Sequence, residues 1–396
     1  MENFHIPPAI KGAKKIPEKK VTLGDWIDHR SALTNNGIVP YGIFTTQLAR
    51  VFEGGLHTGN SLEGLLEFGA DFDLEKLRIM EGATVHASGL WIQDSSNFSA
   101  THVGNFDEFS NIAAVSALRL YQLNLRKSFL NQKLSVKIGQ VALDDDFMIS
   151  AQSLLFTNAS LGTLPLLSAN TSGPIYPLSA LGAWGMMEFS KSFSFQSGIY
   201  DGDAGTQDNN REGFNYKVNT NQGEIILGEA IFSEEINGQH GTYKLGGYYH
   251  TGKFSSYQNG ANHYGNQSFY AVFDQALSGP TAHPSLGVFL RSGMTPRTSQ
   301  NEVDRSLDLG MTGRGFLPDD HAGIAFSHAH FSDAFVRSSK KAGAPVSNDE
   351  SVIELSYQRQ AKSWLIIQPD LQYVINPQNS QARNALVGAV RLRLSL

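Results

Sequence analysis

Acidic side chains recur at one parity of the segment 61–72. Glu63, Glu67 and Asp71 occupy that parity, whereas Phe68 and its apolar neighbours occupy the other. Because alternate side chains of a β-strand point to opposite faces, this segment would have one charged face and one apolar face. Charged groups around a narrow water-filled passage repel ions of the same sign, and they hydrogen-bond to neutral hydroxyl groups. The pattern predicts a strand with water on one side and lipid on the other.

The same parity argument places basic side chains on the polar face of other segments. Arg126 shares its parity with Gln122 and Asn124, and Lys137 alternates with Ile138. A charge on the lipid face near the membrane midplane costs about 2–4 kcal/mol, so most such side chains would line a lumen for that reason alone. The further candidates are Lys244, Arg291, Glu354, Gln368, Asp370, Gln372, Arg391 and Arg393.

Three clusters could instead indicate metal or hydrolytic chemistry. His328 and His330 place two imidazoles on one face of a strand, which could begin a metal site, but no third ligand is evident and solvated lumen or loop histidines are favoured. The acidic pairs at 234–235 and 319–320 could be glycosidase carboxylates, but both fall in predicted turns. The sequence therefore predicts no catalytic residue, no metal ligand and no enzyme.

The elements that would position these residues are short strands. Period-two alternation recurs in about 16 segments, and an even number suits a closed bacterial outer-membrane barrel. The predicted strands are 39–51, 61–72, 82–93, 117–128, 133–142, 183–190, 193–201, 223–232, 242–251, 267–276, 285–294, 304–312, 321–331, 350–359, 364–374 and 384–396.

The connections between these segments alternate in length. Short connections lie at 129–132, 191–192 and 360–363, and long connections rich in Gly, Asn, Ser and Asp lie at 94–116, 143–182, 202–222, 252–266 and 332–349. Each long connection follows an odd-numbered strand, as expected for an antiparallel barrel with short turns on its periplasmic side. The longest, 143–182, exceeds a simple loop, so we expect it to fold inward and narrow the pore. The alternative is that this connection stays outside the barrel and covers its extracellular end.

Composition supports an all-β membrane protein. The chain has 39 Gly, 24 Phe and 13 Tyr with only 17% charged residues. No stretch approaches the roughly 18 apolar residues of a transmembrane helix, so a membrane span would have to be made of strands. The chain lacks cysteine, which excludes disulfides and zinc thiolates. Its net charge of -6 argues against a nucleic-acid partner.

The N-terminal part precedes the predicted barrel. Residues 1–20 include a run of lysines that no apolar stretch follows, and we expect a solvated, removable periplasmic tail. Residues 25–33 have helical spacing, which predicts a short periplasmic helix. The expected organisation is a tail and helix over 1–38 and a single transmembrane barrel over 39–396. A plug domain is not expected, because it would need about 100 residues before the barrel.

Three stretches carry a family resemblance. Leu-Gly-Asp-Trp stands at 23–26, and Asp-Asp-Asp-Phe at 144–147 precedes Phe-Thr-Asn at 156–158. The longest stretch is Trp-Leu-Ile-Ile-Gln-Pro-Asp-Leu-Gln-Tyr-Val-Ile-Asn-Pro at 364–377. Together these stretches span most of the chain, and they resemble the carbohydrate-selective porins of the OprB type.

The resemblance implies passive diffusion of small neutral sugars, such as glucose, through a bacterial outer-membrane channel without a cofactor. It favours pore electrostatics at Asp145 over a calcium site in the triple 144–146. Trp91 could stack on a sugar ring, although anchoring in the aromatic girdle at the membrane interface is the simpler interpretation. The predicted pore-lining residues are Glu63, Glu67, Asp71, Trp91, Arg126, Lys137, Asp145 and Arg291.

Several alternatives stay open at this point. The channel could be a general or anion-type diffusion porin, and a closed lumen would make it a structural or adhesive barrel. A secreted soluble β-protein that binds or hydrolyses carbohydrate is the alternative from another class. The expected partners are small neutral sugars and outer-membrane lipid, and the sequence does not decide between a monomer and a homo-oligomer.

Overall fold

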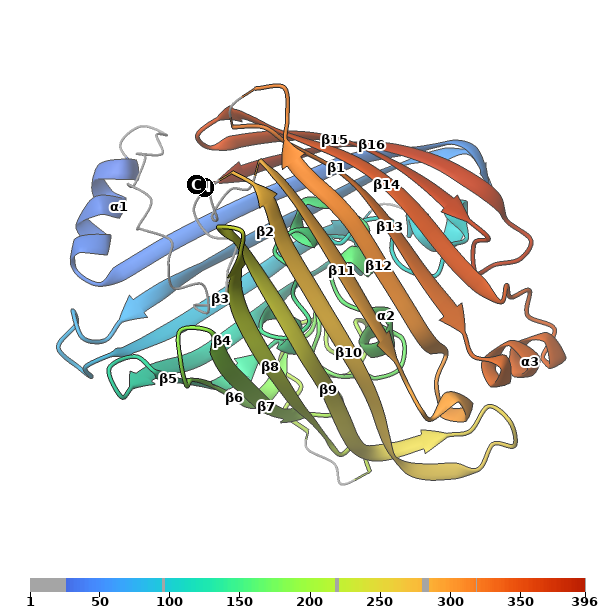
Figure 1. The fold of residues 1–396 in the computed structure, drawn as a ribbon, viewed down its shortest axis with the longest axis horizontal. Coiled ribbons are helices and arrows are strands. Elements are labelled where there is room, and N and C mark those ends of the chain that lie inside the picture. The colour runs from blue at the N-terminus through green and yellow to red at the C-terminus, as the bar shows by residue number, and fades with distance from the viewer. Residues whose placement is uncertain (1–25, 95–96, 218–220, 280–284, 318, 396) are drawn as a thin grey trace.

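A closed antiparallel barrel accounts for most of the chain (Figure 1). The computed structural model describes residues 26–94, 97–217, 221–279, 285–317 and 319–395, so the predicted tail over 1–20 lies outside the described residues. Within them, the barrel has sixteen strands, and β1 (Ile38–Gly55) closes it by pairing with both β2 (Gly59–Asp73) and β16 (Arg383–Ser395). The others are β3 (Ala83–Asp94), β4 (Ala117–Phe129), β5 (Leu134–Val141), β6 (Ala180–Glu188), β7 (Phe193–Asp201), β8 (Glu224–Ile236), β9 (Gln239–Ser255), β10 (Asn262–Ser278), β11 (Leu286–Met294), β12 (Val303–Arg314), β13 (His321–Phe331), β14 (Asp349–Lys362) and β15 (Leu365–Ile375).

The predicted strands are confirmed, because each overlaps one strand of the barrel. Their order around the barrel follows the chain, so each strand pairs with its neighbours in sequence. One predicted connection is wrong: most of 252–266 is strand, because β9 and β10 extend toward each other and leave only 256–261 between them. This long hairpin projects beyond the wall (Figure 1).

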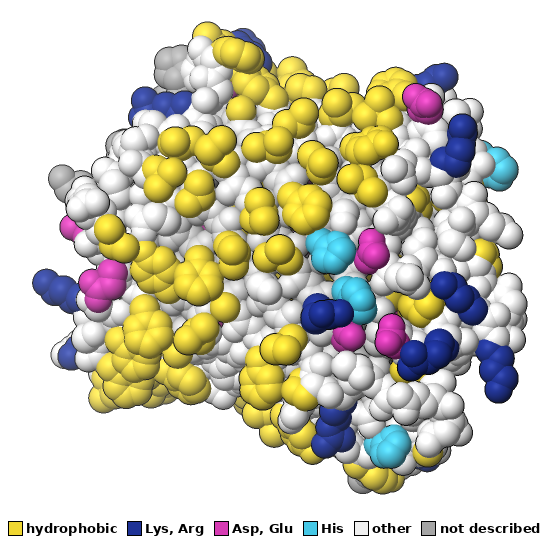
Figure 2. All heavy atoms as spheres, turned by 45° about the vertical axis from the view of Figure 1, so that its right-hand side comes forward, with side chains coloured by type: hydrophobic (Ala, Val, Ile, Leu, Met, Phe, Trp, Pro, Cys, Tyr) yellow, Lys and Arg dark blue, Asp and Glu magenta, His cyan; other side chains and the backbone are white. Residues whose placement is uncertain are grey.

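Strand β2 shows why the chain alternates. Leu62 is 57% exposed and Phe68 41% exposed on the outer face, whereas Glu63 between them is 2% exposed. Glu63 lies opposite the buried Gln47 of β1, so both side chains point into the barrel. The predicted orientation of this strand is therefore confirmed. Apolar side chains cover much of the outer surface of the barrel (Figure 2).

In the part of the chain that the structure describes, three helices of α type accompany the barrel: α1 (Trp26–Asn35), α2 (Pro165–Ser168) and α3 (Asp333–Lys341). The predicted N-terminal helix is confirmed as α1, which lies outside the barrel at the end with the short turns (Figure 1). None of the helices in the described residues is long and apolar enough to cross a membrane.

The longest connection folds into the barrel, as predicted. We call residues 142–179 the inward loop. Leu143, Phe147 and Leu167 of this loop are buried, and they form one apolar cluster with wall residues such as Trp184 and Tyr270. Burial of this apolar surface favours the inward position over a solvated cap.

A second connection also enters the barrel, and the sequence did not predict it. We call residues 97–116 the second inward loop. Phe98, Val103 and Phe109 pack against Val51 and Val387 of β1 and β16. The two loops thus pack against different parts of the wall, the inward loop against strands such as β6 and β10 and the second inward loop against β1 and β16.

Candidate channel constriction

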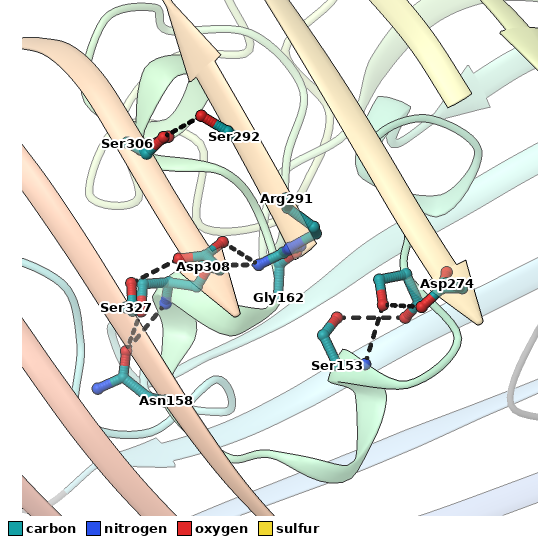
Figure 3. A network of polar contacts seen from close by, with 11 residues as sticks. Ser153, Asn158, Gly162, Asp274, Arg291, Ser292, Ser306, Asp308 and Ser327 are labelled. Atoms are coloured by element: carbon teal, nitrogen blue, oxygen red, sulfur yellow. Dashed lines mark hydrogen bonds and ion pairs between the residues drawn. The ribbon is translucent and has the colours of Figure 1, made fainter. Parts of the chain in front are cut away.

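Arg291 of β11 fastens the inward loop to the wall (Figure 3). Its Nη1 donates to the carbonyl oxygen of Gly162 at 2.6 Å, and its Nη2 donates to the carbonyl oxygen of Ser160 at 2.7 Å. Nη2 also lies 2.8 Å from Oδ2 of Asp308, and both side chains are fully buried. Asp308 therefore neutralises the guanidinium group between the wall and the inward loop.

Acidic wall residues hold the same loop through its backbone. Glu354 of β14 accepts hydrogen bonds from the backbone N–H groups of Thr157 and Asn158. Asp274 of β10 accepts from the Ser150 hydroxyl and from the N–H of Ala151. A buried backbone N–H that loses its acceptor is costly, so these side chains fix the loop position.

Lys137 of β5 belongs to the same anchoring system. Its ammonium forms an ion pair with Asp146 of the inward loop, and the two side chains are 2% and 1% exposed. The ammonium also lies 5.4 Å from the ring centre of Trp184. The ammonium charge of Lys137 is thus neutralised by its ion pair with the inward loop.

Arg391 of β16 holds the second inward loop. Its Nη1 donates to Oδ1 of Asn111 at 2.9 Å, and its Nη2 donates to Oγ of Ser110 at 3.1 Å. Its Nε donates to Oε1 of Gln47. The sequence offered one signal for this loop: the apolar residues at 98, 103, 106, 109 and 112 stand out in an otherwise polar connection.

The wall from β1 to β4 carries partly exposed charges. Glu67 accepts a hydrogen bond from the Tyr41 hydroxyl at 2.9 Å. Asp71 lies 2.8 Å from Nδ1 of His86, its cross-strand partner. Arg126 of β4 lies with its guanidinium carbon 5.8 Å from the centre of the Trp184 ring.

The inward loop and β16 add charges to this part of the lumen. Asp145 accepts a hydrogen bond from Gln122 of β4 and interacts electrostatically with His86 of β3. Arg393 of β16 interacts electrostatically with Glu67. Glu67 thus interacts with Arg393, and Asp71 and Asp145 both interact with His86, so acidic and basic groups meet in this part of the barrel interior. We call Glu67, Asp71, Arg126, Asp145 and Arg393 the constriction charges.

The electrostatics of the inward loop add a pH-sensitive group. Burial, followed by the neighbouring Asp145, raises the pKa of Asp144 to about 7. The Thr163 hydroxyl and the Tyr176 N–H both donate to Asp144 and favour its ionised form, but they only partly offset these effects. Asp144 is thus a carboxyl group whose charge changes near neutral pH.

The predicted site residues divide into four groups. Glu67, Asp71, Arg126 and Asp145 lie inside the barrel with the contacts described above. Glu63 also points inward but is only 2% exposed. Contrary to the prediction, Arg291 faces neither Glu67 nor Asp145, because it pairs with Asp308. Lys137 pairs with Asp146 and also interacts electrostatically with the neighbouring Asp145.

Trp91 does not line the channel. It is 45% exposed and lies opposite Leu66 and Leu118 in the register, and Leu118 is itself 63% exposed on the outer face. Directly opposed residues of neighbouring strands point to the same side, so Trp91 faces the membrane. The structure therefore corrects its placement among the pore-lining residues and leaves the girdle interpretation.

The histidines at 328 and 330 are also misplaced by the sequence interpretation. They share the outward parity of Ile324, which is 43% exposed, and therefore lie on the outer face rather than in the lumen or a loop. Within the described ranges, no group of three or more His, Asp or Glu side chains is arranged to hold a metal ion.

Comparison with known proteins gives the family. The model of the family "Carbohydrate-selective porin, OprB family" matches residues 58–396. The chain belongs to this family. Porin B of Pseudomonas aeruginosa is 23% identical over 95% of this chain and 91% of that protein. QuiX of Acinetobacter baylyi is 24% identical over 96% of this chain and 93% of that protein.

A solved structure supports the same fold. The high-pH structure of Pseudomonas putida OprB superposes with a TM-score of 0.85 at 21% identity, covering 94% of this chain and 97% of that one. As a carbohydrate-selective porin, the protein is a channel of the bacterial outer membrane. The end of the barrel with the long connections is then the extracellular end.

Proposed function

We propose that this porin passes small neutral sugars such as glucose by passive diffusion, and that the constriction charges select them. The observation that carries the proposal is that positively and negatively charged side chains lie together inside the barrel. Glu67, Asp71 and Asp145 supply carboxylates there, and Arg126 and Arg393 supply guanidinium groups.

This arrangement distinguishes sugars from ions for a physical reason. A sugar hydroxyl can donate to a carboxylate and accept from a guanidinium, so a neutral polyol replaces the water that it loses on entry. An ion of either sign meets at least one like charge at close range, where screening by water and salt is incomplete. The barrier for ions would therefore exceed the barrier for a neutral solute of similar size.

Aromatic contact would come from Tyr41 rather than Trp91. The Tyr41 ring stacks on His86 with the ring centres 6.1 Å apart, and its hydroxyl group is fixed by Glu67. A fixed aromatic ring beside a carboxylate offers both an apolar face and a hydrogen-bond acceptor, which is the combination that a sugar ring requires.

Liposome swelling with the purified protein tests the proposal. We expect glucose to enter faster than a charged solute of similar size, such as gluconate, and we expect Tyr41→Ala to reduce this preference. Equal rates for glucose and gluconate would indicate a general diffusion porin, and faster entry of gluconate would indicate an anion-type porin. Either result would overturn the proposal.

A further inference from the structure

The outer face of the barrel has a polar cluster near its extracellular end. Arg305 of β12 lies between Met294 of β11 and His330 of β13 in the register, and Met294 is 55% exposed. The Arg305 side chain is 61% exposed. Figure 2 shows histidine, basic and acidic side chains together on this face, beside hydrophobic side chains. Hydrocarbon cannot satisfy such groups, so a polar ligand is expected there.

Hydrogen bonds hold this cluster in one arrangement. Nη2 of Arg305 lies 3.1 Å from Nε2 of His330, whose Nδ1 lies 2.7 Å from Oδ1 of Asp304. Arginine can only donate, so Nε2 of His330 accepts and its Nδ1 donates to Asp304. Nε of Arg305 also lies 3.4 Å from Oδ1 of Asp304, so this acid partly neutralises the arginine. The Asp304 side chain is only 12% exposed, so the outward part of the cluster is the arginine. His328 is fixed separately by Ser351, with Nδ1 and Oγ 2.9 Å apart.

An apolar depression adjoins the cluster. It has a volume of about 600 Å³, and Arg305, His328 and His330 line it together with residues of β10 and β11. Ala271, Ser292 and Gly293 are among the small residues that line it, and Phe269 and Met294 are among its larger apolar residues. Phe269 is 54% exposed, so this part of the depression opens toward lipid. The depression therefore has a basic end and an apolar part that suits an acyl chain.

Further basic side chains lie at the same end of the barrel. Helix α3, which directly follows β13, carries Arg337, Lys340 and Lys341, and all three are exposed. Asp333 forms an exposed ion pair with Arg337, which leaves the two lysines in excess. On the barrel face, Asp304 pairs with Arg305, and Asp349 lies opposite His330 in the register. The two lysines therefore supply the positive charge at this end that complements an anionic headgroup.

We propose that this outer face binds a phosphorylated glycolipid of the outer leaflet. Arg305 and His328 hold a phosphate of its headgroup, and one acyl chain lies in the depression beside Phe269 and Met294. Lys340 and Lys341 attract further negative charge of the headgroup. Because the ligand has both a charged and an apolar part, it satisfies the polar cluster and fills the depression at once.

Native mass spectrometry of the purified chain in detergent tests this proposal with lipopolysaccharide as the probe. We expect binding by the unchanged protein to fall about tenfold for lipopolysaccharide whose lipid phosphates have been removed, since a phosphate contact is charge-assisted. Inorganic phosphate alone should compete weakly, because it lacks the acyl chain. Equal binding of the phosphorylated and dephosphorylated forms would overturn the proposal without any variant.

The double variant Arg305→Gln, His328→Gln localises the site. We expect about a tenfold loss of lipopolysaccharide binding, with channel conductance unchanged. The matched control is Arg50→Gln, which changes an exposed arginine on β1 that contacts Asn60 at 3.4 Å. An equal loss in the control would contradict the assignment, as would unchanged binding in the double variant. A change in the number of chains per particle without a change in lipid binding would instead assign the face to a second copy.

Discussion

The basic side chains inside the barrel divide into two groups according to their partners. Lys137 is buried in an ion pair with Asp146 of the inward loop, and the buried Arg291 donates hydrogen bonds to two carbonyl oxygens of that loop. Arg126 has no acidic partner among the described residues and stacks on Trp184 instead. Parity places all three side chains inside the barrel, but parity does not say which of them the loop covers. That distinction depends on contacts between residues far apart in the chain, and the sequence alone could not supply it.

Reversal of the Arg126 charge should change selectivity rather than folding. We expect Arg126→Glu to shift the channel toward cations and to slow sugar entry, because it removes a basic group from the constriction charges. Reversal potentials in a salt gradient measure the first effect, and liposome swelling measures the second. Unchanged values for both would make Arg126 a passive part of the wall.

Reversal of the Lys137 charge should destabilise the barrel. Lys137→Glu leaves Asp146 buried beside a second acid, and loss of a buried ion-pair partner costs about 3–5 kcal/mol. The midpoint of heat-induced unfolding, followed by gel migration, should fall accordingly. The matched control is Lys127→Glu on β4, whose ammonium lies over the Phe129 ring instead of in an ion pair. A normal midpoint for the Lys137 variant would contradict its anchoring role.

Acidification should reduce cation preference through Asp144. Burial and Asp145 raise the pKa of Asp144 to about 7, so its negative charge is present at pH 8 and largely lost by pH 6. We expect the cation-to-anion permeability ratio to fall across this interval, and Asp144→Asn to weaken that dependence. An identical pH profile in the variant would exclude Asp144 as the titrating group.

At the scale of elements, the inward loop decides how much of the lumen stays open. Its length predicted the inward fold, and burial of Leu143 and Phe147 confirms it. The second inward loop was not predicted, because polar residues dominate its composition and its few apolar residues follow no strand or helix period. Apolar side chains of both loops also explain why the sequence wrongly predicted that Trp91 lines the pore. Its neighbours Leu90 and Ile92 point inward against loop residues, so an apolar residue no longer marks the lipid side.

Release of the inward loop should widen the channel. Glu354→Ala removes the acceptor of the Thr157 and Asn158 backbone groups, so we expect larger and noisier single-channel currents. The matched control is Glu235→Ala, an exposed glutamate at the end of β8. Wild-type conductance and noise in the Glu354 variant would show that the other anchors suffice.

At the scale of the whole molecule, the barrel was predictable because two independent patterns agree. Alternation gave the strands, and the phase of the long connections gave their antiparallel order. Alternation gives Arg305 the outward parity of Leu307 and Leu309, but the sequence does not show that His330 of β13 and the depression lie beside it, because those depend on pairing between strands. The positions of the two inward loops and the contacts of the outer polar cluster could therefore be learned only from the structure.

Block of single-channel current by glucose tests the central claim most directly. A neutral sugar that binds among the constriction charges should interrupt ion flow, so current through the wild-type channel should fall with glucose concentration until it saturates. Arg126→Glu should require more glucose for the same block, whereas Arg50→Gln on the outer face should behave as wild type. Current that falls only in proportion to solution viscosity, without saturation, would contradict selection of sugars at this constriction.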